Sequence, residues 1–202
     1  DKQTYADIIL NVNKTLGKDW SIVANLGASY NNIGTDELRY GGPIQDNGLA
    51  NVFNVFDLDD TKKRASKSGW NDETQSVFGS VEIGWKKMLY LTATGRNDWA
   101  SQLAGSSTKS FFYPSVGLSW VPTSVWETGA LSYLKLRGSI ASVGMPFPRF
   151  LTIPTYEYDA TNRIWKDKTH YPIGDLKPER TLTYEVGIEA RLWQDLSVNV
   201  SW

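Results

Sequence analysis

Residues 19–30 read DWSIVANLGASY, and this stretch decides the fold because two kinds of side chain alternate along its whole length. One series is apolar, with an aromatic residue at each end: Trp20, Ile22, Ala24, Leu26, Ala28 and Tyr30. The other is small and mostly polar: Asp19, Ser21, Val23, Asn25, Gly27 and Ser29. Successive side chains of a β-strand point to opposite faces, so this period of two predicts a strand with one apolar and one polar face.

The alternation recurs along the chain and predicts about eight strands. The expected strands cover residues 4–15, 19–30, 76–85, 89–96, 112–120, 134–140, 181–192 and 196–202. Complete ones run roughly 10–13 residues, whereas strands of soluble proteins are usually about 5–6 residues long and membrane-spanning strands about 9–11. We therefore expect an all-β fold, an antiparallel transmembrane β-barrel segment. Helical periodicity is almost absent, and Asp57–Lys67 is the one stretch that could form a short helix, inside a polar loop.

Short and long connections alternate between these strands. The short polar links are Thr15–Lys18, Lys86–Met88, Trp193–Asp195 and the somewhat longer Pro122–Leu131. The long ones are Asn31–Trp70, Ala100–Lys109 and Met145–Glu179. Outer-membrane barrels have short periplasmic turns and long extracellular loops, whereas loops of this size are uncommon in compact soluble domains. The order of the links therefore predicts a barrel with its long loops outside the cell.

The composition excludes several classes of protein. The 202 residues contain no Cys and one His, so we expect no disulfide framework, no metal site built from Cys or several His residues, and no cofactor. Lys and Arg number 21 against 22 Asp and Glu, a net charge of −1, which argues against a nucleic-acid-binding protein. The sequence has no run of about 18 apolar residues, so no transmembrane helix is expected.

Aromatic residues make up 13% of the chain and include nine Trp, more than a soluble core usually needs. One group lies beside the short turns: Trp20, Trp85, Tyr90, Trp120, Trp126, Tyr133 and Trp193. Another lies beside the long loops: Tyr30, Trp99, Phe111, Phe112 and Tyr113. Membrane barrels carry aromatic girdles at both interfaces, so these positions predict two girdles. The alternative, a β-sandwich core, would place aromatic residues in the middle of strands.

Two sets of residues are candidates for contact with a solute. Charged residues on the polar faces are expected to line a water-filled lumen: Glu82, Arg96, Lys135, Arg137, Glu185, Glu189 and Arg191. The solvated face of a soluble sheet would show the same pattern. Aromatic residues in the long loops are candidates for stacking against a ligand, or for packing the loops together: Tyr40, Trp70, Trp99, Tyr156, Tyr158 and Trp165.

Other polar groups carry weaker signals. Asp57, Asp59 and Asp60 offer oxygen ligands but lack the spacing of a calcium loop, so a solvated acidic turn is expected. Glu185 and Glu189 would be about 13 Å apart on one strand, too far for a glycosidase pair. His170 is expected at the surface, and we find no set of nucleophile, His and acid, so no enzyme activity is expected.

Four segments resemble successive strands of SusC/RagA-type TonB-dependent transporters. They are 88–98 (MLYLTATGRND), 112–120 (FYPSVGLSW), 134–144 (LKLRGSIASVG) and 176–189 (LKPERTLTYEVGIE). Each string alone is weak, but together they keep the order and spacing of the family. The first 70 residues resemble the family only in their general pattern, without a matching motif.

The resemblance implies that residues 1–202 are part of the β-barrel domain, about eight strands of a 22-stranded barrel, with the plug and the TonB-box region absent. It further implies a location in the outer membrane of a Gram-negative cell and active import of an oligosaccharide or peptide. The implied partners are TonB, acting through the absent N-terminal region, a SusD-like surface lipoprotein over the long loops, the remaining barrel segments and outer-membrane lipid. Two alternatives stay open: a secreted carbohydrate-binding β-sandwich and a complete eight-stranded outer-membrane barrel.

Overall fold

The structure is a computed structural model of the chain and describes residues 1–46, 54–126, 129–145, 147–159, 162–167, 171–193 and 195–202. Within these residues there are ten strands and three 3₁₀ helices. The strands are β1 (Lys2–Leu16), β2 (Trp20–Gly41), β3 (Arg64–Trp85), β4 (Leu89–Ala100), β5 (Phe111–Trp120), β6 (Leu131–Met145), β7 (Tyr156–Asp159), β8 (Ile164–Asp167), β9 (Glu179–Leu192) and β10 (Leu196–Ser201). The 3₁₀ helices are Val55–Asp57, Ser101–Leu103 and Pro122–Ser124.

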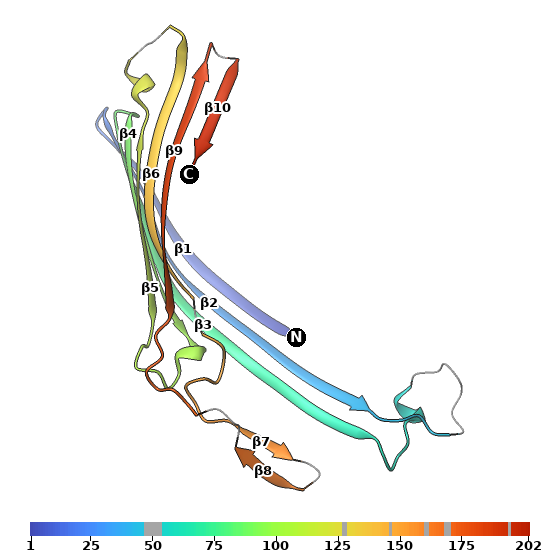
Figure 1. Cartoon of the computed structure of the whole chain (residues 1–202). Helices are drawn as coiled ribbons and strands as arrows, with labels where there is room; N and C mark the ends of the chain where they lie inside the picture. The colour runs from blue at the N-terminus through green and yellow to red at the C-terminus, as the bar shows by residue number, and fades with distance from the viewer. Residues whose placement is uncertain (47–53, 127–128, 146, 160–161, 168–170, 194) are drawn as a thin grey trace.

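Eight of the described strands form one antiparallel sheet in the order β1-β2-β3-β4-β5-β6-β9-β10, and β7 and β8 form a separate hairpin. The sheet curves into an arc, with β1 and β10 at its two ends (Figure 1). The expected all-β antiparallel barrel segment is confirmed. Because β1 and β10 lie at opposite ends of the order, the described strands form an open arc and not a closed eight-stranded barrel.

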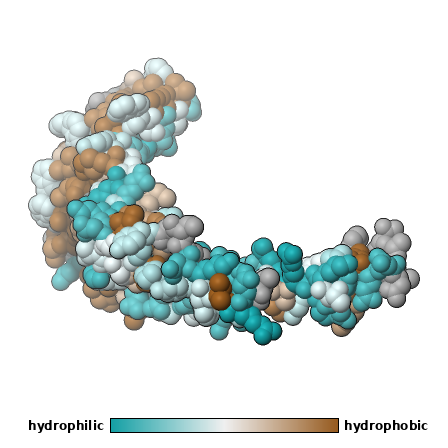
Figure 2. All heavy atoms as spheres, turned by 60° about the horizontal axis from the view of Figure 1, so that its bottom comes forward, coloured by the Kyte–Doolittle hydropathy of each residue, from teal (hydrophilic) through white to brown (hydrophobic). Residues whose placement is uncertain are grey.

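The register of the strands keeps the two faces of the sheet separate. Directly opposed residues share a face, so each ladder row is uniform in character. One row of the apolar face runs across six strands: Val12, Ala24, Val81, Ala93, Val116 and Ile140. One row of the polar face runs across five: Asn25, Ser80, Thr94, Ser115 and Ala141. Hydrophobic residues gather along the outer side of the arc (Figure 2).

The apolar face has no second layer over it in the described part of the chain. Leu26 is 58% exposed and Val186 is 55% exposed, and among the described residues the buried hydrophobic side chains are Leu103 and Phe111. Soluble proteins rarely expose a continuous apolar face of this extent, whereas the outer wall of a membrane barrel does so in lipid. A β-sandwich would pack this face against another sheet, so that alternative is wrong. Among the described residues, no helix has the length and hydropathy needed to cross a membrane.

The short-turn end of the apolar face carries a cluster of Trp side chains. The Trp20 and Trp85 ring centroids are 6.4 Å apart, and those of Trp120 and Trp126 are 6.2 Å apart. Tyr90 and Tyr133 lie opposite Ser119 and Arg191 on the polar face. The expected girdle is therefore made by Trp residues, and the two Tyr residues face the other way.

Two expected loops contain strands instead. The hairpin of β2 and β3 continues in register to the pair Gly41 and Arg64, so most of Asn31–Trp70 is an extension of the sheet. The prediction that Asp57–Lys67 could form a short helix is wrong. The helical residues in this part of the hairpin are Val55–Asp57, and β3 begins at Arg64. Beyond residue 31 the strict alternation of apolar and polar residues is lost, with only scattered apolar residues such as Leu38 and Tyr40 on one face, while the backbone pairing persists. Met145–Glu179 likewise contains the β7–β8 hairpin.

Candidate functional site

The charged residues expected to line a lumen share the polar face of the sheet. Arg137 lies opposite Gly187, Lys135 opposite Glu189, and Tyr133 opposite Arg191. Glu82 and Arg96 lie in the same series of positions on β3 and β4, opposite Thr92 and Phe78. By register, all seven expected residues lie on this face: Glu82, Arg96, Lys135, Arg137, Glu185, Glu189 and Arg191.

Several of these charges are paired with neighbours on the same face. Arg137 Nη2 lies 3.2 Å from Glu185 Oε1, and its side chain crosses Gly187, where a Cβ atom would lie only 2.7 Å from Arg137 Nε. Thr92 donates a hydrogen bond to Glu82 over 3.3 Å. The face is therefore strongly polar without a large excess of either charge.

Arg96 is the centre of a small network near the long-loop end of this face. Its Nε is 2.7 Å from Asp98 Oδ1, and its Nη2 donates to the buried hydroxyl of Ser76 over 2.8 Å. The guanidinium group also lies over the Phe78 ring, 5.6 Å from the centroid. These contacts hold the Arg96 side chain against the wall.

The structure places three of the six aromatic candidates within the long strands and not in loops. Tyr40 lies near the end of β2, Trp70 lies in β3, and Trp99 lies in β4. Trp99 opposes Gln75, in the same series as Leu89 and Leu91, so it belongs to the apolar face. Tyr40 belongs to the same side of β2 as Trp20, whereas Trp70 continues the polar face. Their roles as ligand contacts remain a prediction.

Trp70 already has a partner that the sequence did not reveal. The Arg149 guanidinium group lies 3.5 Å from the Trp70 ring centroid, and Arg149 Nε lies 2.5 Å from Asp72 Oδ2. Arg149 therefore occupies one face of the ring. It stands 77 residues from Asp72, so no local sequence pattern could have identified the contact.

The other three aromatic candidates come together on the β7–β8 hairpin. Tyr158 opposes Trp165, and their ring centroids are 5.1 Å apart. Tyr156 lies two positions from Tyr158 and so on the same face of the hairpin. The exposed fractions of Tyr156 and Trp165 are 60% and 70%. The hairpin thus presents an exposed aromatic surface that could stack on a ligand.

A cluster of hydrogen bonds joins the connection after β4 to the connection after β6. Ser106 Oγ donates to the Leu176 carbonyl over 2.8 Å, and Ser107 Oγ donates to Asp175 over 2.7 Å. The Thr152 hydroxyl donates to the Ala104 carbonyl. Ser106 and Thr152 are buried. This hydrogen-bond cluster, which the sequence did not indicate, fixes the base of the segment that carries β7 and β8.

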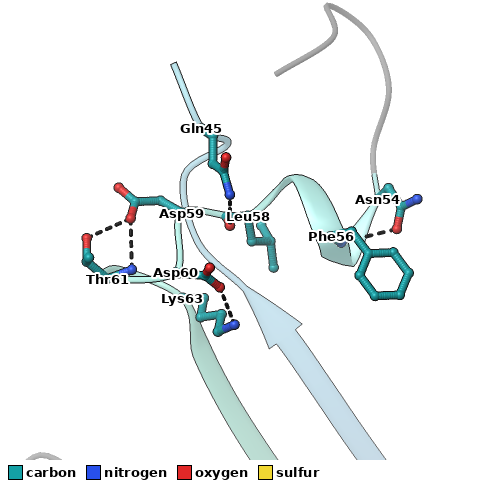
Figure 3. A network of polar contacts seen from close by, with 8 residues as sticks. All are labelled: Gln45, Asn54, Phe56, Leu58, Asp59, Asp60, Thr61 and Lys63. Carbon is teal, nitrogen blue, oxygen red and sulfur yellow. Dashed lines mark hydrogen bonds and ion pairs between the residues drawn. The ribbon is translucent and has the colours of Figure 1, made fainter. Parts of the chain in front are cut away.

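The acidic residues at the tip of the β2–β3 hairpin stabilise a turn. Asp59 Oδ1 accepts hydrogen bonds from the Thr61 amide over 2.9 Å and from the Thr61 hydroxyl over 2.6 Å, and Asp60 pairs with Lys63 (Figure 3). The bonds from Thr61 hold the pKa of Asp59 at about 2, below its ordinary value of 3.8. No group of three or more metal-ligating side chains occurs in the described part of the chain. His170 lies outside the described residues.

The open antiparallel arc, with its apolar outer side and paired charges on its polar side, defines the wall of an outer-membrane β-barrel. Residues 1–202 match the family described as TonB dependent receptor-like, beta-barrel, and the chain belongs to this family. The resemblance to TonB-dependent transporters and the outer-membrane location expected from it are confirmed. The family is one of receptors and transporters rather than of enzymes.

Solved structures show the same fold. The structure of the RagAB peptide importer in the "closed-closed" state matches with a TM-score of 0.78 and 19% sequence identity, over 98% of this chain and 23% of the other. The structure of the RagAB peptide transporter matches with a TM-score of 0.75 at 19% identity and the same coverage. The chain thus spans about a quarter of the length of the chains it matches. A search of curated proteins gives no match.

Proposed function

We propose that these residues form part of the barrel wall of a transporter that imports a nutrient oligomer, an oligosaccharide or a peptide, across the outer membrane with energy from TonB. The observation that supports this most strongly is the separation of the two faces in a chain that belongs to the TonB-dependent family throughout. The outer face would contact lipid, and the polar face would line the path of the solute.

We further propose that a SusD-like surface lipoprotein covers the long connections, and that TonB acts through a plug-bearing region beyond these residues. The matched structures are of a peptide importer, which favours a peptide among the two candidate solutes. The exposed aromatic surface of β7 and β8 is compatible with either, since Tyr and Trp rings stack on sugars and on peptide side chains.

Uptake by whole cells tests this proposal. A strain that lacks the full-length gene should lose uptake of at least one class of labelled oligomer from a panel of peptides and oligosaccharides, and the loss of TonB should give the same defect. Copurification of a surface lipoprotein with the full-length protein would support the proposed partner. Uptake that is unchanged for every oligomer, or that does not depend on TonB, would contradict the proposal.

A further inference from the structure

A cavity lined by basic residues lies at the far end of the β2–β3 hairpin. It has a volume of about 890 Å³ and is lined by Arg39, Tyr40, Gly41, Gly42, Pro43, Thr61, Lys62, Lys63, Arg64 and Ser66. Four of these residues are cationic, and none is acidic. Ligand pockets commonly have volumes of about 300–1,000 Å³, so there is room for several residues of an extended ligand.

The register of the hairpin places the two Arg residues on one side. Arg39 opposes Ser66 and Gly41 opposes Arg64, so these four residues share the face that continues the polar face of the sheet. Arg39 and Arg64 are therefore diagonal neighbours in the ladder, a relationship that corresponds to about 7–8 Å between backbone positions. Gly41 lies opposite Arg64, and no other atom lies within 4 Å of the position that its Cβ atom would take.

Arg64 retains its capacity to bind an anion, since it forms no ion pair with another residue of the described ranges. Arg39 engages Glu37 through Nε alone, at 2.7 Å, which leaves its terminal nitrogens as donors. Lys62 pairs with Asp59 and Lys63 with Asp60, so these two Lys residues contribute less to the binding of an anion. A guanidinium group is planar and matches a carboxylate with two parallel hydrogen bonds.

The turn that carries these groups is fixed by backbone contacts. The Asp59 amide donates to the Pro43 carbonyl over 2.9 Å, and the Gln45 amide donates to the Asp57 carbonyl over 2.8 Å. Gln45 also donates from its side chain to Leu58 over 3.2 Å (Figure 3). At Gly42 a Cβ atom would lie 3.0 Å from Lys63 Cα, so Gly42 allows the two sides of the hairpin to approach closely. These contacts fix the backbone of the turn that carries the basic residues.

We propose that this basic tip cavity binds an acidic peptide, with Arg39 and Arg64 each holding one carboxylate. On an extended peptide, side chains two residues apart point the same way and lie about 6.6–6.8 Å apart, which is close to the diagonal spacing of the two Arg residues. The inference rests on the proposed function and names the chemistry of the solute: a peptide with Glu or Asp at alternate positions.

The test uses the purified full-length transporter and a synthetic peptide of alternating Glu and Ser, with a peptide of alternating Gln and Ser as its neutral counterpart. The wild type should bind the Glu peptide at least tenfold more tightly than the Gln peptide, and salt should weaken this binding. Arg39→Gln together with Arg64→Gln should remove most of the preference. Lys67→Gln is the matched control, because it removes a positive charge from the opposite face of the same hairpin and should change little.

Three results would overturn the inference: equal binding of the two peptides, an unchanged preference in the double variant, or an equal loss in Lys67→Gln. Tighter binding of an oligogalacturonate of the same charge would contradict the assignment to peptides. Equal amounts of wild type and variants in the outer membrane exclude a folding defect. If TonB-dependent uptake of other oligomers persists while any of these contradicting results is obtained, the inference is wrong and the proposed function stands.

Discussion

Arg149 lies over Trp70, with its guanidinium group 3.5 Å from the centroid of the indole ring. The same side chain forms an ion pair with Asp72. Both contacts tie the connection between β6 and β9 to β3, across 77 residues of sequence. Trp70, a candidate for ligand contact or for packing the loops together, therefore anchors the segment that carries the β7–β8 hairpin.

Arg149→Ala should loosen this segment. A cation–π contact and a partly exposed ion pair together contribute on the order of 1 kcal/mol, so local opening should become about fivefold more frequent. Limited proteolysis of the full-length protein measures this as faster cleavage between residues 147 and 178. Arg180→Ala is the control, since Arg180 forms no ion pair with any described residue, and it should leave the cleavage rate unchanged.

Charges placed on the two faces of β9 should have very different effects. Val186→Arg puts a charge on the apolar face and should destabilise the folded protein by about 2–4 kcal/mol if that position is near the middle of the bilayer. Thr183→Arg puts the same charge on the polar face, opposite Ala141, and should cost far less. Urea unfolding of the full-length protein in lipid vesicles gives both values. Similar losses from both variants would contradict the assignment of one face to lipid and the other to water.

Two glycines should differ sharply in their tolerance of Ala. At Gly27 a Cβ atom would lie 2.5 Å from the Phe78 ring, whereas at Gly138 the nearest atom would be 3.9 Å away. Gly27→Ala must displace a ring and should destabilise the fold by about 1–3 kcal/mol, while Gly138→Ala should change stability by well under that amount. Thermal unfolding of the two full-length variants compares them directly. Equal stability would show that Phe78 does not pack over Gly27.

The turn at Asp59 should respond to acid at an unusually low pH. Its folded-state pKa of about 2 is lower than the ordinary value of 3.8, so ionised Asp59 stabilises the turn fully above pH 3.8, and this stabilisation is lost as the pH falls toward 2. Hydrogen exchange at the Thr61 amide, corrected for its intrinsic pH dependence, should show protection that persists at pH 3. Asp59→Asn should remove the pH dependence, and loss of protection already near pH 4 in the wild type would contradict this assignment.

Local alternation in the sequence was enough to predict the strands of the membrane wall, because burial on one face imposes a strict period of two. It could not predict the outer half of the β2–β3 hairpin, where one face carries Thr35, Glu37 and Arg39 and the other has no continuous apolar series. The charged residues of the polar face were assigned from the same alternation, and the register places all of them together. The interactions of Arg149 and the hydrogen-bond cluster of Ser106 and Thr152 join segments that are distant in the sequence, so no local pattern predicts them.

The apolar face of the sheet should contact lipid, and the polar face should contact water. These residues contain no Cys, so single Cys substitutions at positions 181–188 of the full-length protein, with any Cys elsewhere replaced, can each carry one nitroxide label. Spin-label accessibility in lipid vesicles should alternate, with 182, 184, 186 and 188 open to oxygen in the lipid and 181, 183, 185 and 187 open to a water-soluble nickel complex. An accessibility without this period, or with the two sets exchanged, would contradict the account.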